Sequence, residues 1–483
     1  MIPKITLRAA LNDPNLLDMA APSWIAWRSL LLAAMGEPLL PEELEYFRKL
    51  TGRDEPPSKR VDEFWCVIGR RGGKSKAVAA LCVYIAGLCE HRHLLSAGER
   101  GVVMTMAADR RQAGVILAYV VGLLERSPIL KQLIVRKTSE EVELSTGITI
   151  EVRTASFRSL RGFTSIAVVA DEIAIWYSDE SANPDTEILA AVRPTLATTG
   201  GPLIAISSPY ARKGAMWETF SRHYGPEGDP AILVAQGETL ALNLERDASG
   251  RPKLQSVVDR AYERDPADAS AEYGAQFRSD LEAFVRREVL ADCTDDVSER
   301  PYESASAYVA FTDPSGGSAD AFTLAIAHVE DNIVVLDLVR EVVPPFMPSE
   351  VVEQFADILK SYKIRTVQGD RYAGEWPPEQ FNRNGIAYEP SELTKSEIYG
   401  ELLPLLNSRT VALLENDRLQ RQLLSLERRT SRGGRDAIDH PRGGRDDLAN
   451  AVAGALVMAQ KAPSAAVLRR GPINYPPTWG QVV

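Results

Sequence analysis

The sequence is poor in cysteine and has no long hydrophobic run. Its four cysteines form no CxxC pair and show no zinc-like spacing, which argues against a zinc site or a disulfide framework and predicts buried, reduced thiols in a cytosolic protein. The longest apolar stretches, such as residues 77–88, are too short to cross a bilayer. Residues 1–15 lack the apolar core and the cleavage site of a signal peptide. We therefore expect no membrane partner.

Positive charge is also scarce. Lys and Arg together number 55 against 66 for Asp and Glu, which gives a net charge of -11. Taken alone, this balance argues against a general polyanion binder, but it is compatible with local basic grooves and with acid clusters that hold metal. The chain has 483 residues, of which 45% are hydrophobic and 25% charged. These values exclude a disordered acidic chain and predict two or three folded domains.

Two stretches of the sequence carry α/β patterns. Between residues 60 and 210, short apolar runs bounded by turn residues alternate with helical segments, which is typical of a mostly parallel sheet. From residue 308, three strand-like runs follow one another before helices and a fourth strand. We predict an N-terminal segment and a first α/β domain in residues 1–240, a connector in 241–300, a second α/β domain in 301–462 and an extended, proline-rich tail in 463–483.

The expected elements are specific enough to test. In the first domain we predict strands at 64–68, 102–106, 166–170 and 203–207, helices at 75–89 and 112–126, and a hairpin over 141–154. The connector contains a helical stretch through 257–277. In the second domain we predict strands at 308–312, 322–328, 333–339 and 366–369, and helices at 349–362 and 447–460.

A glycine-rich segment follows the first predicted strand and opens a helix. Its glycines let backbone N–H groups face phosphates, its lysine reaches the β and γ oxygens, and its serine hydroxyl is suited to a Mg²⁺ ligand position. The usual spacing has glycine at position 68, where this chain has Ile68. The alternative is a glycine-rich turn with a surface lysine. The residues of this candidate ATP site are Gly69, Arg70, Arg71, Gly72, Gly73, Lys74 and Ser75.

A second element supports the ATP site. An apolar strand ends in Asp171 and Glu172, where the aspartate is placed to hold Mg²⁺ and the glutamate to polarise the water that attacks the γ-phosphate. Ser207 and Ser208 end a further strand and are candidates for hydrogen bonding near the γ-phosphate. Because these elements occur in this order, an NTPase is favoured over acids that only begin a helix.

Arginines and tryptophans complete the candidate nucleotide site. Positive charge near the γ-phosphate offsets the charge that develops during transfer. Arg70 and Arg71 lie within the loop and are candidates to act in cis, while Arg158 and Arg161 precede the acidic strand and are candidates to act on a neighbouring subunit; binding of DNA or of surface carboxylates is the alternative for each. Trp24 and Trp27 either flank adenine or pack in the core, and core packing is favoured.

Acidic residues recur at strand ends in the second domain. Asp313 and Asp370 each end a strand, and Asp446 and Asp447 begin the last helix. Such acids repel one another at one sheet edge unless cations bind, so the set predicts two Mg²⁺ or Mn²⁺ ions that activate water and stabilise a leaving oxygen. The alternative for each acid alone is a turn or cap, and the sequence does not decide which of Asp446 and Asp447 binds metal.

Two further features adjoin this acidic set. Asp320 is a weaker candidate ligand, and His440 is either a ligand, a phosphate contact or a plain loop histidine. Between residues 421 and 445 seven arginines stand with paired glycines and only three acids, which predicts a flexible basic segment that contacts a phosphate backbone. A solvated basic loop is the alternative.

The motifs GRRGGKS, SLRG, VVADE and SSP, followed by FTD, QGD and RDDLANA, resemble those of the large terminase subunit of tailed bacteriophages. The resemblance covers most of the chain and implies a P-loop ATPase domain of the ASCE type joined to an RNase H-like nuclease. It further implies that Lys74 and Ser75 bind phosphate and metal, that Asp171 is linked to Mg²⁺, that Glu172 is catalytic and that Ser207 and Ser208 form a coupling motif. By the same resemblance Arg70 is the loop arginine, Arg161 is the leading candidate to act across subunits, and the nuclease acids are Asp313, Asp370 and the pair Asp446 and Asp447.

The resemblance also implies partners and a setting. We expect double-stranded DNA as substrate, a ring of five copies docked on the portal protein of a procapsid, a small terminase subunit as partner, and a location in the host cytoplasm. The tail that ends in PPTWGQVV is a candidate docking peptide or a disordered terminus. Two alternatives remain: a DNA helicase or mobile-element ATPase with an attached nuclease, and a non-catalytic assembly factor with a nucleotide switch.

Overall fold

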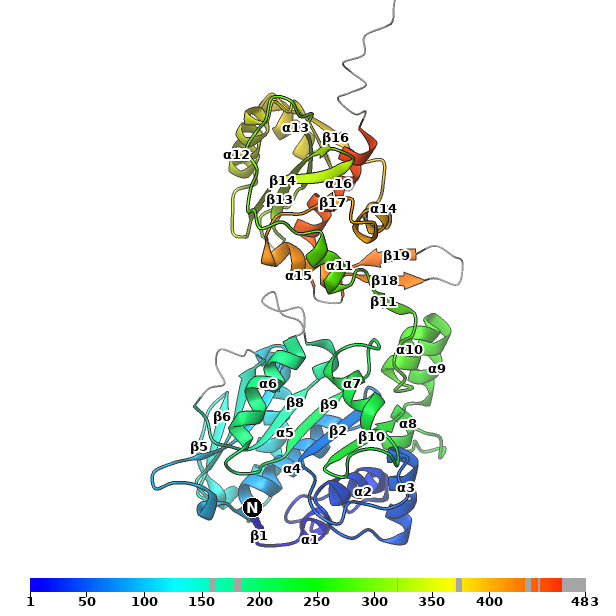
Figure 1. Cartoon of the computed structure of the whole chain (residues 1–483). Coiled ribbons are helices and arrows are strands. Elements are labelled where there is room, and N and C mark those ends of the chain that lie inside the picture. Colours follow the sequence, from blue (N-terminus) through cyan, green and yellow to red (C-terminus); the bar gives the residue numbers. More distant parts are fainter. Residues whose placement is uncertain are drawn as a thin grey trace, which may run out of the picture. The chain divides into compact units, whose positions relative to one another are not determined.

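The computed structural model describes residues 1–155, 162–176, 184–318, 320–370, 376–430, 436–441 and 444–462. The chain forms two compact units, Met1–Asp280 and Leu281–Val483 (Figure 1). The boundary between them falls inside the predicted connector, so that residues 241–280 belong with the first unit and residues 281–300 with the second.

The first unit contains an eight-stranded sheet whose strand order is β10-β2-β9-β8-β4-β7-β6-β5. Its first six strands run parallel. The strand β6 pairs antiparallel with β7, with which it forms the predicted hairpin, and β5 pairs antiparallel with β6. The central strands are buried along their whole length because helices cover both faces of the sheet. The bounds are β10 Ile232–Gly237, β2 Glu63–Ile68, β9 Leu203–Ser207, β8 Ser165–Asp171, β4 Gly101–Ala107, β7 Ile148–Thr154, β6 Glu141–Leu144 and β5 Ile134–Lys137.

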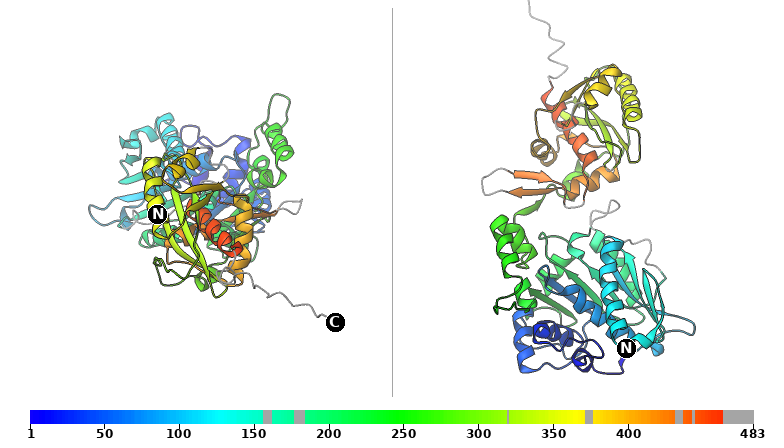
Figure 2. Two further views of the ribbon diagram at one scale, coloured as in Figure 1. Left: turned by 90° about the horizontal axis from the view of Figure 1, so that it is seen from above. Right: turned by 180° about the vertical axis from the view of Figure 1, so that it is seen from behind.

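Helices cover the two faces of this sheet unequally. Alternate side chains of each strand point to opposite faces, and those of one face pack on five helices that include the almost wholly apolar α4. Those of the other face pack on two helices, which lie in front of the sheet in Figure 1 and behind it in the rear view of Figure 2. The first group is α1 (Leu7–Asn12), α2 (Ile25–Ala34), α3 (Pro41–Thr51), α4 (Lys74–Leu88) and α5 (Arg110–Arg126), and the second is α6 (Pro184–Leu196) and α7 (Gly214–His223).

Residues 238–278 complete the first unit. The helical stretch predicted through 257–277 is two helices, α9 (Gln255–Arg264) and α10 (Pro266–Glu272), preceded by the short α8 (Thr239–Leu242). The break occurs because Asp265 is extended and caps α10 through its side chain, and because Pro266 lacks the N–H that a continuous helix needs. The four cysteines of the chain are buried, unpaired thiols, as predicted.

The second unit contains a six-stranded mixed sheet of order β16-β15-β12-β13-β14-β17. The strands β12, β13 and β14 form an antiparallel meander, and β15 then pairs parallel to β12 on its other side. Since β15 and β12 are parallel, their carboxyl ends meet at one edge. The bounds are β16 Ala387–Pro390, β15 Thr366–Gly369, β12 Val309–Asp313, β13 Phe322–Glu330, β14 Ile333–Val342 and β17 Val411–Ala412.

Helices cover both faces of this sheet too. On one face α16 lies so close to β12 that a Cβ added at Gly454 would come within 2.3 Å of the Phe311 ring, so glycine is required there. The helices of this face are α11 (Arg287–Asp292), α14 (Lys395–Asn407), α15 (Asp417–Ser425) and α16 (Asp447–Lys461), and those of the other face are α12 (Pro348–Ser361) and α13 (Trp376–Arg383).

A small antiparallel sheet adjoins the second unit's core. It consists of β11 (Leu281–Ala283), β18 (Glu427–Thr430) and β19 (Asp436–Asp439). The segment 421–445, predicted to be flexible and basic, contains in its described part the end of α15 and the hairpin of β18 and β19. Its buried Leu423, Leu426 and Ile438 explain the difference, because they anchor this part of the chain in the core.

The predicted fold class is confirmed. In the first unit one strand, β9, separates the strand before the glycine-rich loop from the strand that ends in acids, which is the ASCE arrangement. In the second unit the meander with parallel additions is RNase H-like. All eight predicted strands are present within three residues of their predicted bounds.

Candidate functional sites

The first candidate site lies at the carboxyl edge of three neighbouring parallel strands. The glycine-rich loop follows β2, Ser207 and Ser208 end β9, and Asp171 ends β8. Register places Ser207 level with Val67, and Asp171 level with Ile206. Ligands of open α/β sheets bind at this edge, so the fold brings three predicted motifs together although they are far apart in the sequence.

Lys74 is the centre of this site. Its side chain is only 7% exposed, and Nζ donates hydrogen bonds of 2.9 Å to the Ile68 carbonyl oxygen and to Ser208 Oγ. The carboxylate of Glu172 lies 3.6 Å from the same Nζ. A cation held in this way at the start of α4 is placed to receive phosphate oxygens, together with the N–H groups of the helix N-terminus.

Glu172 is held by the end of the neighbouring strand. Its Oε2 accepts hydrogen bonds from Ser207 Oγ at 3.0 Å and from the Ser208 backbone N–H at 3.1 Å. The residue has a φ of 51° and a ψ of 40°, which is the left-handed region and costs a non-glycine residue free energy. The structure therefore connects this acid directly to Ser207 and Ser208.

Asp171 is buried behind Glu172. Only 4% of it is exposed, and burial together with the negative charge of Glu172 raises the pKa of Asp171 to about 7, an effect that Lys74 opposes. A carboxyl group with so high a pKa favours a bound cation over an uncompensated charge. Position and chemistry both suit the predicted Mg²⁺-linked acid.

The backbone of the loop is fixed from two sides. Trp27 is fully buried, and its indole N–H donates to the Gly72 carbonyl at 2.6 Å, so Trp27 packs in the core. Trp24 is half-buried and lines a small pocket beside Gly72 and Gly73. On the other side Thr239 and Asn243 donate to the carbonyls of Arg70 and Arg71. Asn243, which falls in the predicted connector, thus supports the loop together with Thr239.

The two loop arginines differ in their contacts. Arg70 is half exposed, and its guanidinium forms an ion pair of 3.1 Å with Glu272 of α10. Arg71 is exposed and has a φ of 62°. Gly69 and Ser75 lie at the two ends of the loop, Ser75 as the second residue of α4. Arg158 and Arg161 lie outside the described residues.

The second candidate site lies at one edge of the other sheet. Asp313 ends β12, and register places Thr312 level with Gly369, so that Asp370 follows β15 at the same edge. Asp447 begins α16 and is joined to β13, since its side chain accepts from the Ala321 N–H and its carbonyl from Thr323 Oγ1. The strand β13 pairs directly with β12, so the three acids converge. Asp320 is exposed beside them.

Burial and mutual repulsion raise the pKa values of carboxyl groups in this cluster. Burial, followed by the charges of Asp447, Asp370 and Asp446, raises the pKa of Asp313 to about 8, although a hydrogen bond from Asn450 opposes the shift. Burial likewise raises the pKa of Asp447. Carboxylates this close favour protonation or a bound cation. The oxygen donors fit Mg²⁺ or Mn²⁺, which prefer carboxylates.

Asn450 is a member of the site that sequence reasoning missed. It lies on α16 one turn after Asp447, and its Nδ2 donates to Asp313 Oδ2 at 2.8 Å. Only 2% of Asn450 is exposed, and its Oδ1 is among the buried polar atoms of the described residues that have no hydrogen-bond partner. A buried, unsatisfied oxygen is costly, and a cation or an ordered water at this edge would satisfy it. The spacing of DDLAN, with asparagine one helical turn after the acids, was the available sequence signal.

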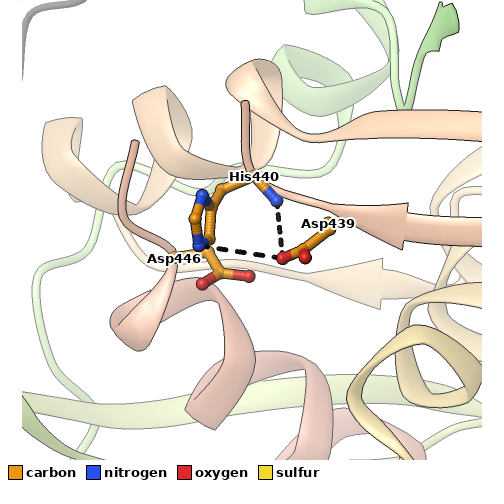
Figure 3. Close-up of side chains that lie close together, drawn as sticks. All are labelled: Asp439, His440 and Asp446. Atoms are coloured by element: carbon orange, nitrogen blue, oxygen red, sulfur yellow. Dashed lines mark hydrogen bonds and ion pairs between the residues drawn. The ribbon is translucent and has the colours of Figure 1, made fainter. Parts of the chain in front are cut away.

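Asp446 and Asp447 differ in their partners. Asp446 is 5% exposed and accepts from Tyr399 OH at 2.9 Å, and the ammonium of Lys395 lies 3.1 Å from its Oδ2. Asp439 and His440 complete this neighbouring group (Figure 3), in which His440 Nδ1 lies 2.9 Å from the Pro441 carbonyl. Asp447, by contrast, contacts the start of β13. Asp447 is therefore better placed than Asp446 to join Asp313 and Asp370.

Fold and sites together define the class of protein. The first unit has a P-loop fold of the ASCE arrangement, and its lysine, acids and strand-end serines meet at one edge of the sheet. The second is an RNase H-like domain that gathers carboxylates at the end of β12. Both sites are built from residues that are brought together by parallel strands and one helix.

Comparisons with known proteins give the following result. No family model and no curated protein matches the chain, whereas solved large terminase structures from several phages are similar to it. The HK97 bacteriophage large terminase matches with a TM-score of 0.39 and 16% identity over 90% of this chain and 99% of that one. The ATPase domain of the Thermus phage P74-26 large terminase has a TM-score of 0.35 and 19% identity, and covers 45% of this chain and 89% of its own.

A nuclease domain that was solved by itself is also similar to part of the chain. The large terminase nuclease of thermophilic phage G20c matches with a TM-score of 0.31 and 17% identity over 35% of this chain and 94% of that one.

Proposed function

We propose that this chain is a large terminase: an ATP-hydrolysing motor that moves double-stranded viral DNA into a procapsid, with a metal-dependent nuclease that cuts the DNA. The observation that carries the proposal is the pairing of two complete sites on one chain. Lys74, Ser208 and Glu172 form one network, and Asp313, Asp370 and Asp447 meet at the edge of an RNase H-like sheet.

In the first site the chain's residues bind and orient ATP. Gly73 and the start of α4 present N–H groups to phosphates, and Lys74 exchanges its contacts with Ser208 and Glu172 for phosphate oxygens. Mg²⁺, when bound, neutralises phosphate charge, with Ser75 and Asp171 as its proposed ligands. Glu172 then orients and polarises the attacking water. Since Ser207 and Ser208 hold the same carboxylate, they are proposed to sense the change when the γ-phosphate leaves.

In the second site Asp313, Asp370 and Asp447 are the proposed ligands of two Mg²⁺ or Mn²⁺ ions. The ions, when bound, activate water and stabilise the leaving oxygen of a phosphodiester. Asn450 orients the Asp313 carboxylate through its amide. Arg428 and Arg429 on β18 lie in the neighbouring hairpin sheet and are proposed, with the other arginines of 421–445, to contact the DNA backbone.

The remaining partners are proposals that depend on the resemblance to large terminases. They are a ring of five copies on the portal protein of a procapsid, a small terminase subunit, a location in the host cytoplasm, and Arg158 or Arg161 acting on a neighbouring copy. Within the described part of the chain, no helix combines the length and the apolar character that crossing a membrane requires.

A packaging assay tests the proposed function. Purified chain, procapsids with portal protein, the small subunit and ATP are expected to protect double-stranded DNA from added nuclease, and ADP in place of ATP to abolish protection. Strand separation of a forked duplex without packaging would instead support a helicase. Packaging that persists when ATP hydrolysis is blocked would support a non-hydrolysing assembly factor and contradict the motor.

Metal binding to the second site should depend on pH. Because the pKa of Asp313 is raised to about 8, its carboxyl is largely protonated near pH 6, and a cation must displace that proton. Affinity for Mn²⁺ is expected to rise by about tenfold per pH unit between about pH 6 and pH 8, as for release of one proton, and to level off above. Calorimetric titration without nucleotide measures it, and the same slope in Asp313→Asn would contradict the assignment.

A further inference from the structure

Lys395 occupies an unusual position beside the carboxylate site. It is the first residue of α14, with its side chain 30% exposed. Its ammonium donates to Asp439 Oδ1 at 2.7 Å and lies 3.1 Å from Asp446 Oδ2. Asp439 ends β19 of the basic hairpin, and Asp446 precedes α16, the helix that carries Asp447 and Asn450. One lysine thus connects three elements at the edge of the site.

The residues around this ammonium have the composition of a metal site. Asp439, His440 and Asp446 each offer one ligand atom, and these atoms all lie within 4.8 Å of one another (Figure 3). Two carboxylates and an imidazole are ligands that a divalent transition-metal ion accepts. Both carboxylates, however, already contact the Lys395 ammonium. The chain itself supplies the cation that this trio would otherwise attract.

Charge explains why a cation is needed here. Asp446 is buried, and it adds its charge to a neighbourhood that already contains Asp313, Asp370 and Asp447. A fourth carboxylate that is buried and has no partner would repel the other three and compete for their ions. The ammonium of Lys395 and the hydroxyl of Tyr399 both contact Asp446 Oδ2. Because these contacts occupy Asp446 Oδ2, this oxygen does not bind a metal ion, and the contacts also fix the start of α16.

We propose that Lys395 is a positioning residue of the nuclease site: its ammonium fills a latent metal site formed by Asp439, His440 and Asp446, keeps a surplus divalent ion out, and leaves Asp313, Asp370 and Asp447 as the ligand set. The inference deepens the proposed nuclease function and rests on it. It also gives the two acids at the start of α16 different roles: Asp447 binds metal, and Asp446 binds the Lys395 ammonium.

Lys395→Met tests the proposal in the full-length protein. Without the ammonium, Asp439, His440 and Asp446 are expected to bind about one Mn²⁺ more per chain than the wild type does. Cleavage of DNA in Mn²⁺ is expected to fall by about 10- to 100-fold, the range for loss of an outer-shell partner. Bound Mn²⁺ is counted by equilibrium dialysis or by its electron paramagnetic resonance signal, without nucleotide, and cleavage is measured on plasmid DNA.

Three matched variants separate a charge effect from damage to the fold. Lys395→Arg keeps the cation and should bind the wild-type number of ions. Lys395→Met combined with Asp446→Asn removes cation and anion together, and should lose the additional ion and regain part of the cleavage rate. Asp446→Asn alone should bind the wild-type number of ions, because Asp446 is not a ligand. Because Lys395 lies in the second unit, thermal unfolding followed by circular dichroism reports whether each variant is folded.

The contrary results are equally specific. Wild-type ion number and wild-type cleavage in Lys395→Met would overturn the proposal, as would an additional ion that persists in the double variant. If Lys395→Met does not fold, loss of one ion in Asp446→Asn would overturn it, since Asp446 would then be a ligand. Absence of Mn²⁺-dependent cleavage by the wild type would instead refute the nuclease function, and the ion counts would still decide the role of Lys395.

Discussion

Glu172→Gln is expected to slow ATP hydrolysis by about 10²- to 10⁴-fold, the usual contribution of a positioned acid or base. Glutamine keeps the size of the side chain and can still accept the hydrogen bonds of Ser207 and the Ser208 N–H, but it has no negative charge to polarise water. Nucleotide affinity should be retained or slightly increased, because Lys74 loses the carboxylate 3.6 Å away that competes with phosphate. Phosphate release and titration with a fluorescent nucleotide measure the two effects.

The control for this variant is Glu187→Gln. Glu187 is an exposed acid in the first turn of α6 in the same unit, so the change removes an equal charge away from the loop and should leave hydrolysis within about twofold. Retained turnover in Glu172→Gln would refute the catalytic assignment. Loss of nucleotide binding in that variant would mean that Glu172 shapes the site instead of acting in it.

Asp370→Ala is expected to reduce Mn²⁺-dependent DNA cleavage by at least about 100-fold, since even outer-shell partners of a metal are worth 10- to 100-fold. Asp370 follows β15 level with Asp313, and its carboxylate is one of three proposed to hold the ions that activate water. ATP hydrolysis should be unaffected, because the two sites lie in separate units of the chain. Nicking of supercoiled plasmid and release of phosphate are the two measurements.

Two further variants make this test specific. Asp313→Asn should give the same loss of cleavage, whereas Asp357→Asn, at an exposed position on α12, should cleave at the wild-type rate. Loss of both activities in Asp370→Ala would contradict the division into two sites. Cleavage that survives in both Asp370→Ala and Asp313→Asn would place the nuclease elsewhere or remove it from the proposed function.

The sheets were predictable because their strands are strong local patterns. β2, β8 and β9 are runs of buried apolar residues that end in a glycine-rich loop, acids or serines, and each pattern is complete within a few residues. The helices α13, α14 and α15 were not predicted. Proline interrupts α14, α13 is short and has two prolines in its first turn, and α15 is a short amphipathic segment whose apolar residues pack only against distant elements such as α16.

The candidate sites were predictable to the extent that their residues stand at strand ends. The register of parallel strands brings Asp171 to Ser207, and Asp313 to Asp370, without any further information. Lys395 and Glu272 do not stand at strand ends, so no sequence pattern identifies them. Lys395 contacts Asp446, and Glu272 contacts Arg70, only because helices pack against segments that are distant in the sequence. The choice between Asp446 and Asp447 likewise depends on three-dimensional contacts that neighbouring residues of one chain cannot reveal.

The ion pair between Arg70 and Glu272 has a thermodynamic consequence. If a phosphate recruits Arg70, the pair must break, and α10 loses a contact with the loop. Linkage is reciprocal, so a load on α10 that breaks the pair must raise phosphate affinity by the same factor. α10 is also the last helix before the second unit begins at Leu281. Breaking the pair at α10 is therefore expected to strengthen phosphate binding, and phosphate binding is expected to weaken the pair.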